Sequence, residues 1–174
     1  MVSGAVSGDL VNVRVKKSKS NYYEAELIEI LEKSPFRVEP KCIHFGVCGG
    51  CKWQNLSYEK QLDVKQDEVF NNIKRIDSLE DFETLPILGS EEHYFYRNKM
   101  EFSFSNARWL TQYEISSEEN FGNRDALGFH IPGMWSKILD LKECWLQEDP
   151  SNALRLAVKS YAVKNGLEFF DVKA

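Results

Sequence analysis

The stretch C-I-H-F-G-V-C-G-G-C, residues 42–51, carries three thiols separated by gaps of five and two residues. The sequence has one further cysteine, Cys144, far downstream. Thiolates bind soft and borderline metals strongly, and four of them complete either a zinc site or an iron–sulfur cluster. Gly49 and Gly50 let the backbone approach a bulky inorganic core. The stretch therefore predicts a metal centre that ties two distant parts of the fold together.

Spacing alone leaves three interpretations of the four thiols. Zinc sites more often pair two C-x2-C knuckles, and this sequence has one, whereas gaps of five and two suit the wider footprint of a cubane cluster. Free, partly buried thiols are the third interpretation. His44 lies inside the stretch, but with four cysteines present we do not expect it to be a ligand. The spacing favours a [4Fe-4S] cluster over zinc, and zinc over free thiols.

Composition and charge narrow the class of protein. The 174 residues suffice for one ordinary domain or two small ones. A net charge of −5 argues against a protein that coats nucleic acid indiscriminately. Charge is uneven, because residues 11–20 are basic without an acid and residues 77–92 are acidic without a base. No apolar run is long enough to span a bilayer and no signal pattern opens the chain, so we expect a cytoplasmic monomer.

Periodicity predicts short strands and two long helices. The expected strands are 11–16, 22–31 with a bulge at Leu27–Ile28, 97–105, a hairpin of 126–131 and 136–141, and 167–170. The first helix is expected over 58–76 with Ser57 as its cap, and the last from Pro150 to Asn165, capped by Asp149. We expect a turn longer than two residues at Pro132–Gly133, an acidic linker over 77–92 and a loop over 114–124.

Four motifs together resemble one family. The stretch C-I-H-F-G-V-C-G-G-C-K-W-Q (42–54) is accompanied by Y-R-N-K-M-E-F (96–102), L-G-F-H (127–130) and D-L-K-E-C (140–144). They resemble the bacterial RNA (uracil-5-)-methyltransferases, especially those that act on 23S ribosomal RNA, over most of residues 5–174. The resemblance implies a [4Fe-4S] cluster, with zinc as the alternative, held by Cys42, Cys48, Cys51 and Cys144. It also implies S-adenosylmethionine as the methyl donor of the full-length parent.

The same resemblance implies an α+β fold in two parts. Residues 1–40 would form part of a TRAM domain, an OB-like barrel, with residues 1–9 as the end of a segment cut inside that barrel. Residues 41–174 would form the central iron–sulfur domain that binds RNA, with a mixed antiparallel sheet and helices.

Catalysis is expected to lie outside this chain. Methylating uracil at C5 needs a nucleophile added at C6, a role that the family gives to a cysteine thiolate. All four cysteines are assigned to the cluster, and no glycine-rich loop follows a strand to bind S-adenosylmethionine. We therefore predict a non-catalytic fragment without the C-terminal S-adenosylmethionine domain.

Basic residues among aromatic ones indicate where RNA would bind, because cations hold phosphates and aromatic rings stack on unpaired bases. The candidates are Arg97, Asn98, Lys99, Lys52, Lys16, Lys17 and Lys19. The competing interpretation is a core strand with solvated charges, and for the three lysines near residue 17 ordinary protection of a strand edge. Trp53 is as well placed in the sequence to shield a cluster as to touch RNA.

The expected partner is 23S ribosomal RNA. The sister class that modifies transfer RNA is the alternative, although it generally lacks the cluster. Two further classes stay open at this point: a zinc-stapled RNA-binding module with no enzymatic parent, and a redox or radical protein that uses the cluster directly.

Overall fold

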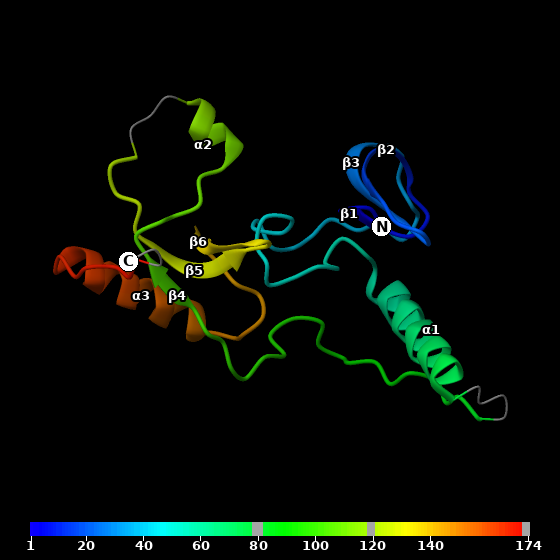
Figure 1. Cartoon of the computed structure of the whole chain (residues 1–174). Coiled ribbons are helices and arrows are strands. Elements are labelled where there is room, and N and C mark those ends of the chain that lie inside the picture. The colour runs from blue at the N-terminus through cyan, green and yellow to red at the C-terminus, as the bar shows by residue number, and fades with distance from the viewer. Residues whose placement is uncertain (78–81, 118–120, 172–174) are drawn as a thin grey trace. The chain divides into compact units, whose positions relative to one another are not determined.

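The computed structural model describes residues 1–77, 82–117 and 121–171. The fold is mixed α+β, and the described part contains two three-stranded sheets and three helices (Figure 1). The chain divides into two compact units, Met1–Pro40 with Trp53–Glu91, and Lys41–Lys52 with Glu92–Ala174. Within the described ranges, no helix has the length and apolar character that a bilayer crossing needs.

The sheet of the first unit contains β1 (Val2–Ser3), β2 (Leu10–Ser18) and β3 (Tyr23–Glu32) in the order β1-β3-β2. The predicted antiparallel pair is confirmed, and so is its bulge, because Asn12 pairs with Glu29 and Val13 with Leu27, which skips Ile28. Residues 1–9, which we expected to be the end of a segment cut inside a barrel, contribute a strand to this sheet, because Val2 and Ser3 pair in parallel with β3.

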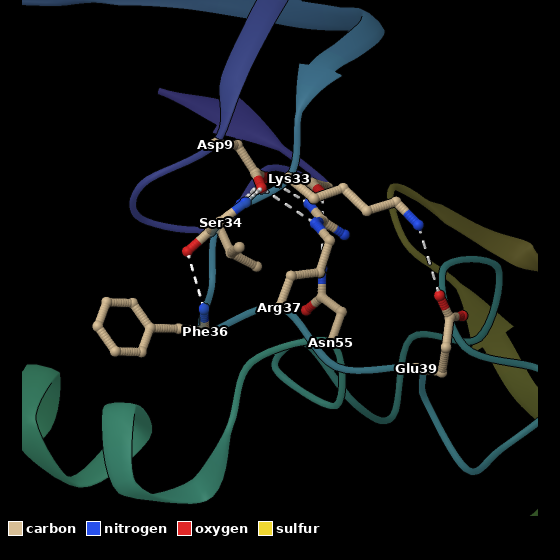
Figure 2. A network of polar contacts seen from close by, with 9 residues as sticks. Asp9, Lys33, Ser34, Phe36, Arg37, Glu39 and Asn55 are labelled. Atoms are coloured by element: carbon tan, nitrogen blue, oxygen red, sulfur yellow. Dashed lines mark hydrogen bonds and ion pairs between the residues drawn. The ribbon is translucent and has the colours of Figure 1, made fainter.

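A buried carboxylate ties the first unit together (Figure 2). The side chain of Asp9 is fully buried and forms an ion pair with Arg37, whose Nε lies 3.1 Å from Oδ1. The main-chain N–H groups of Val6 and Ser34 donate to the same carboxylate at 2.8 and 2.9 Å. Arg37 also donates to the carbonyl of Gly4. One carboxylate therefore joins the β1–β2 turn to the segment that follows β3.

Helix α1 (Tyr58–Asp77) matches the predicted helix to within a residue at its end. Ser57 Oγ accepts the N–H of Lys60 at 3.4 Å, which confirms the predicted cap. Residues 53–91 fall with the strands of the first unit, whereas we expected them with the cysteine loop. The reason is local pairing: the N–H of Val38 donates to Asn55, and that of Ser57 donates to Phe36.

The acidic segment 77–92 is only partly described. Residues 78–81 lie outside the described ranges, and residues 82–91 form neither helix nor strand. The Gln66 side chain accepts the N–H of Ile87 at 2.9 Å and donates to the carbonyl of Leu85 at 3.2 Å, so this segment is fastened to α1.

The second unit is built on an antiparallel sheet in the order β4-β5-β6, with β4 (Ser103–Ser105), β5 (Ala126–Ile131) and β6 (Met134–Asp140). Ile131, Leu139 and Leu141 form its core, and Cys48 and Phe102 pack against them. The cysteine loop therefore reaches the hydrophobic core of this unit through one of its thiols.

Two predictions on this sheet need correction. The strand expected over 97–105 is paired with β5 only at 103–105, and the N–H of Arg97 donates instead to the carbonyl of Leu146. The hairpin turn is a tight one of two residues, since Ile131 pairs with Met134. Gly133, at φ +74, supplies the left-handed conformation that the second central position of a type II turn requires after Pro132.

The helices of the second unit bring three more corrections. The loop expected over 114–124 contains a short helix, α2 (Gln112–Ser116), begun by a capping box of Thr111 and Glu114. The last helix, α3 (Ser151–Lys164), ends at Asn165 as expected, but Asp149 does not cap it. Residues 167–170 form no strand, although Phe169 is buried against the Phe104 ring.

Candidate metal centre

Hydrogen bonds within the cysteine loop fold it into tight turns. The carbonyl of Cys42 accepts the N–H of Phe45 at 3.1 Å, and the carbonyl of His44 accepts that of Cys48 at 2.9 Å. The N–H of Gly50 donates to the Sγ of Cys48 at 3.4 Å, as expected for a backbone that surrounds a metal–sulfur core. Gly49 lies so close to β5 that an added Cβ would stand 2.8 Å from the carbonyl oxygen of His130. Only glycine fits this loop onto the sheet.

Cys144 reaches the same unit from the segment after β6. Its side chain is buried, and the amide of Asn152, near the start of α3, donates to its carbonyl at 2.8 Å. The structure thus brings all four predicted ligands into one compact unit, from two segments that are far apart in the sequence. All four cysteines are thiols.

Burial and the neighbouring thiols raise the pKa values of Cys42, Cys48 and Cys144. The pKa of Cys48 is raised to about 11, mainly by burial and to a smaller extent by the neighbouring thiols of Cys51, Cys42 and Cys144, while the N–H of Gly50 acts to lower it. Burial is also the main reason that the pKa values of Cys42 and Cys144 are raised, and Cys51 contributes to both. Four thiolates here would repel one another without a compensating cation, so metal binding must release protons.

Positive charge lies near Cys144. Arg155 is 4% exposed and donates to the carbonyl of Leu141 and to Asn152, and its Nε has no hydrogen-bond partner within the described part of the chain. Arg155 and Arg97 both act electrostatically to lower the pKa of Cys144. A buried guanidinium is costly unless an anion offsets it. A cluster held by four thiolates carries the sign of charge that would do so.

The described residues contain no group of three or more His, Cys, Asp or Glu side chains arranged as a ready-made site for a metal ion. The donor set nevertheless fits a cubane cluster, because its four thiolates attach at the corners of a core several atoms across and need not converge on one point. The Nε2 atom of His44 accepts the N–H of Lys142 at 2.9 Å, so its lone pair is directed to that N–H group and not to the thiols.

The predicted RNA contacts of the second unit are exposed. Arg97, Asn98, Lys99 and Lys52 all lie on the surface, and Lys99 forms an ion pair with Glu101 at 2.7 Å. Tyr96, next to Arg97, is 59% exposed, so its ring is accessible for stacking. Residues 96–99 are thus an exposed segment with cations and an accessible aromatic ring, and the part expected to be a strand, 97–99, is unpaired.

The lysines of the first unit are differently placed. Lys16 and Lys17 lie on β2 and face acidic residues of β3, with ion pairs to Glu26 at 3.3 Å and to Glu24 at 3.5 Å. Lys19 is exposed just beyond the end of β2. The acidic partners reduce the positive field of this strand, so the basic run in the sequence does not form a purely basic face.

Comparison with known proteins gives sequence relatives that are named as RNA methyltransferases. A protein of Bacteroides thetaiotaomicron named as an uncharacterized RNA methyltransferase is 47% identical over 97% of this chain. One of Chlorobaculum tepidum with the same description is 44% identical over the whole chain. The chain spans only about 37% and 36% of the lengths of these two relatives. No family model matches the chain.

A solved structure shares the fold. The Pyrococcus abyssi tRNA (uracil-54, C5)-methyltransferase, in complex with S-adenosyl-L-homocysteine, matches 99% of this chain and 34% of its own chain with a TM-score of 0.63. Sequence identity is 23%, so the match concerns the fold alone. The α+β chain is therefore related in sequence to proteins named RNA methyltransferases, over roughly a third of their length.

Proposed function

We propose that this chain is the RNA-recognition and iron–sulfur portion of an RNA methyltransferase that transfers a methyl group from S-adenosylmethionine to C5 of a uridine. Cys42, Cys48, Cys51 and Cys144 hold a [4Fe-4S] cluster in this proposal. The observation that carries it is the presence of four thiols, from two distant segments, in one compact unit of a chain whose relatives are named RNA methyltransferases.

The first part of the chain is proposed to be part of a TRAM domain. In support, β2 and β3 form a long antiparallel pair whose register shifts at three places. Bulges of this kind increase the twist and bending that a small barrel needs. The second part, which carries the cysteines, is proposed to be the central domain.

In this proposal the cluster has a structural role and no catalytic one. Bound through four thiolates, a [4Fe-4S] cluster has no open iron for a substrate and can cross-link the loop to the segment after β6. The nucleophile that attacks C6, and the site for S-adenosylmethionine, belong in this proposal to the remaining two-thirds of a protein as long as the relatives. This chain contributes the binding and orientation of RNA.

The RNA surface is proposed to centre on Tyr96, Arg97, Asn98 and Lys99. Exposure of the tyrosine ring beside a guanidinium supports this choice, because stacking and phosphate contacts together suit unpaired bases. Lys52 follows the last cysteine of the motif and extends the same unit's positive surface. Lys16, Lys17 and Lys19 are secondary in this proposal, because they lie on or just beyond β2, in the unit that does not hold the cysteines.

We propose 23S ribosomal RNA as the substrate, on the strength of the cysteine motif, and transfer RNA as the alternative. The solved structure with a related fold is named as a tRNA methyltransferase, but its low identity gives the fold without the substrate. Binding competition between the two RNA classes would separate them.

RNA binding by this chain should be weak, salt-dependent and unaccompanied by catalysis. Arg97→Gln and Lys99→Gln are each expected to lower the slope of log affinity against log salt by about 0.7, the value for one contact to single-stranded RNA. Lys164→Gln is the matched control, an exposed lysine in the last turn of α3 outside the proposed surface, and should change the slope less. Fluorescence anisotropy with a labelled RNA over a salt series measures all three.

The same preparation, incubated with labelled S-adenosylmethionine and RNA, should transfer no methyl group. Methylation of uridine by this chain alone would contradict the assignment of all four cysteines to the cluster. Equal slopes for the three variants and the unmodified chain would contradict the proposed RNA surface.

A further inference from the structure

Two short segments meet side by side around the thiols of Cys42 and Cys144. The N–H of Ile43 donates to Glu143 Oε1 at 3.0 Å. The N–H of Lys142 donates to His44 Nε2 at 2.9 Å. The segments therefore run antiparallel, with residue 43 matched to 143 and residue 44 to 142.

A third contact continues the same register. The ammonium group of Lys41 lies 4.0 Å from the centre of the Trp145 ring and 5.0 Å from that of Tyr94, a cation–π arrangement. The indole N–H of Trp145 in turn donates to Glu143 Oε1 at 3.0 Å. One carboxylate oxygen therefore receives a donor from each of the two segments.

This register has a consequence for the cysteines. Since residue 41 matches 145 and residue 43 matches 143, Cys42 stands opposite Cys144. The contacts use no sulfur atom and no metal. We call them the latch: the side chains of Lys41, His44, Glu143 and Trp145 with the main-chain N–H groups of Ile43 and Lys142.

We propose that the latch positions Cys42 against Cys144 before any metal binds, with Glu143 as its central acceptor. The role of the latch in cluster assembly rests on the proposed function. Ile43 and Glu143 are 100 residues apart in the sequence, and closing so long a loop costs conformational entropy. If the contacts of the latch offset this entropy cost during folding, Cys42 and Cys144 are already close together when the cluster binds.

The chemistry of Glu143 suggests a sharp test. Both donors to Oε1 are neutral, so the latch needs an acceptor oxygen at this position more than it needs a negative charge. Glu143→Gln keeps that oxygen and loses the charge, whereas Glu143→Ala loses both. The two variants have the same net charge, and comparing them separates positioning from electrostatics.

The experiment uses the full chain without metal, in a Cys48→Ser/Cys51→Ser background that leaves Cys42 and Cys144 as its thiols. In glutathione buffers, the two thiols lose two electrons and two protons as their disulfide forms, and one glutathione disulfide becomes two glutathione molecules. The equilibrium gives the effective concentration of one thiol at the other.

Glu143→Ala should lower this effective concentration about 5- to 30-fold, as expected for the loss of one to two hydrogen bonds. Glu143→Gln should stay within about twofold of the background protein. Lys41→Met, which keeps the stem and removes the cation, should lower it about two- to five-fold, and this variant tests the latch if Glu143→Ala does not fold. Glu168→Ala removes an exposed acid of the same unit and should have no effect.

Three results would overturn the latch. One is an unchanged effective concentration in both Glu143→Ala and Lys41→Met. Another is an equal loss in Glu143→Gln and Glu143→Ala, which would make charge the cause. The third is a background value no higher than that of the chain in urea. This assay contains no metal, so it tests the latch alone. Failure of the cluster proposal would instead appear as missing iron in the unmodified chain, and the two failures are therefore distinguishable.

Discussion

Cys144→Ser is expected to abolish stable iron binding and to lower the melting temperature of the anaerobic protein. Cys144 is the one proposed ligand outside the loop, and its side chain is buried, so no other cysteine can take its place. A serine hydroxyl is a poor substitute for a thiolate toward iron. Metal binding contributes to folding free energy, and we expect a decrease on the order of 10 °C.

The control for this variant is the metal-free protein. Without metal, Cys144→Ser and the unmodified chain should melt within a few degrees of each other, because the exchange replaces one atom. Iron analysis and thermal unfolding monitored by circular dichroism give both quantities. Unchanged iron content in Cys144→Ser would show that Cys144 is not the fourth ligand.

Asp9→Ala is expected to destabilise the first unit by about 3–5 kcal/mol, the usual effect of breaking a buried ion pair. The Arg37 side chain is 13% exposed and would lose its carboxylate partner, and the N–H groups of Val6 and Ser34 would lose their acceptor. Glu39→Ala is the matched control, since its pair with Lys33 is exposed and should contribute little. Urea unfolding at neutral pH measures both variants.

The same carboxylate predicts a pH dependence. The Arg37 side chain holds the pKa of Asp9 far below its usual value of 3.8, and the N–H groups of Ser34 and Val6 lower it further. A lowered pKa means that the contribution to stability is present above about pH 4 and is lost as the pH falls. Asp9→Asn should therefore lose less stability than the unmodified chain between pH 4 and pH 2. Equal losses would contradict the role given to the Asp9 carboxylate.

Local patterns predicted the longer elements well. The apolar stripe of α1 and the alternation of β2 and β3 are regular over many residues, and both were confirmed. Shorter elements depend on partners that the pattern does not show. Residues 100–105 alternate like a strand, yet Arg97 is bonded to the segment at Leu146 and the ladder is limited to 103–105. The capping box at Thr111 was visible in the sequence and was overlooked.

The site was only partly predictable for a similar reason. The cysteine spacing indicated that the loop and Cys144 would meet, and the structure places them in one unit. The basic run at residues 14–19 indicated an RNA surface. The sequence did not show that glutamates of β3 would form ion pairs with this run. His44 and Glu143 were considered only as a ligand candidate and as part of a motif. Their pairing depends on the register of two segments, which no local pattern reveals.

The most direct test of the central claim is the metal content of the unmodified chain, purified and handled without oxygen. Analysis of iron and acid-labile sulfide should give about four of each per chain in a brown protein, as a cluster held by four cysteines requires. A colourless protein that binds one zinc ion and no sulfide, even after anaerobic reconstitution with iron and sulfide, would contradict it.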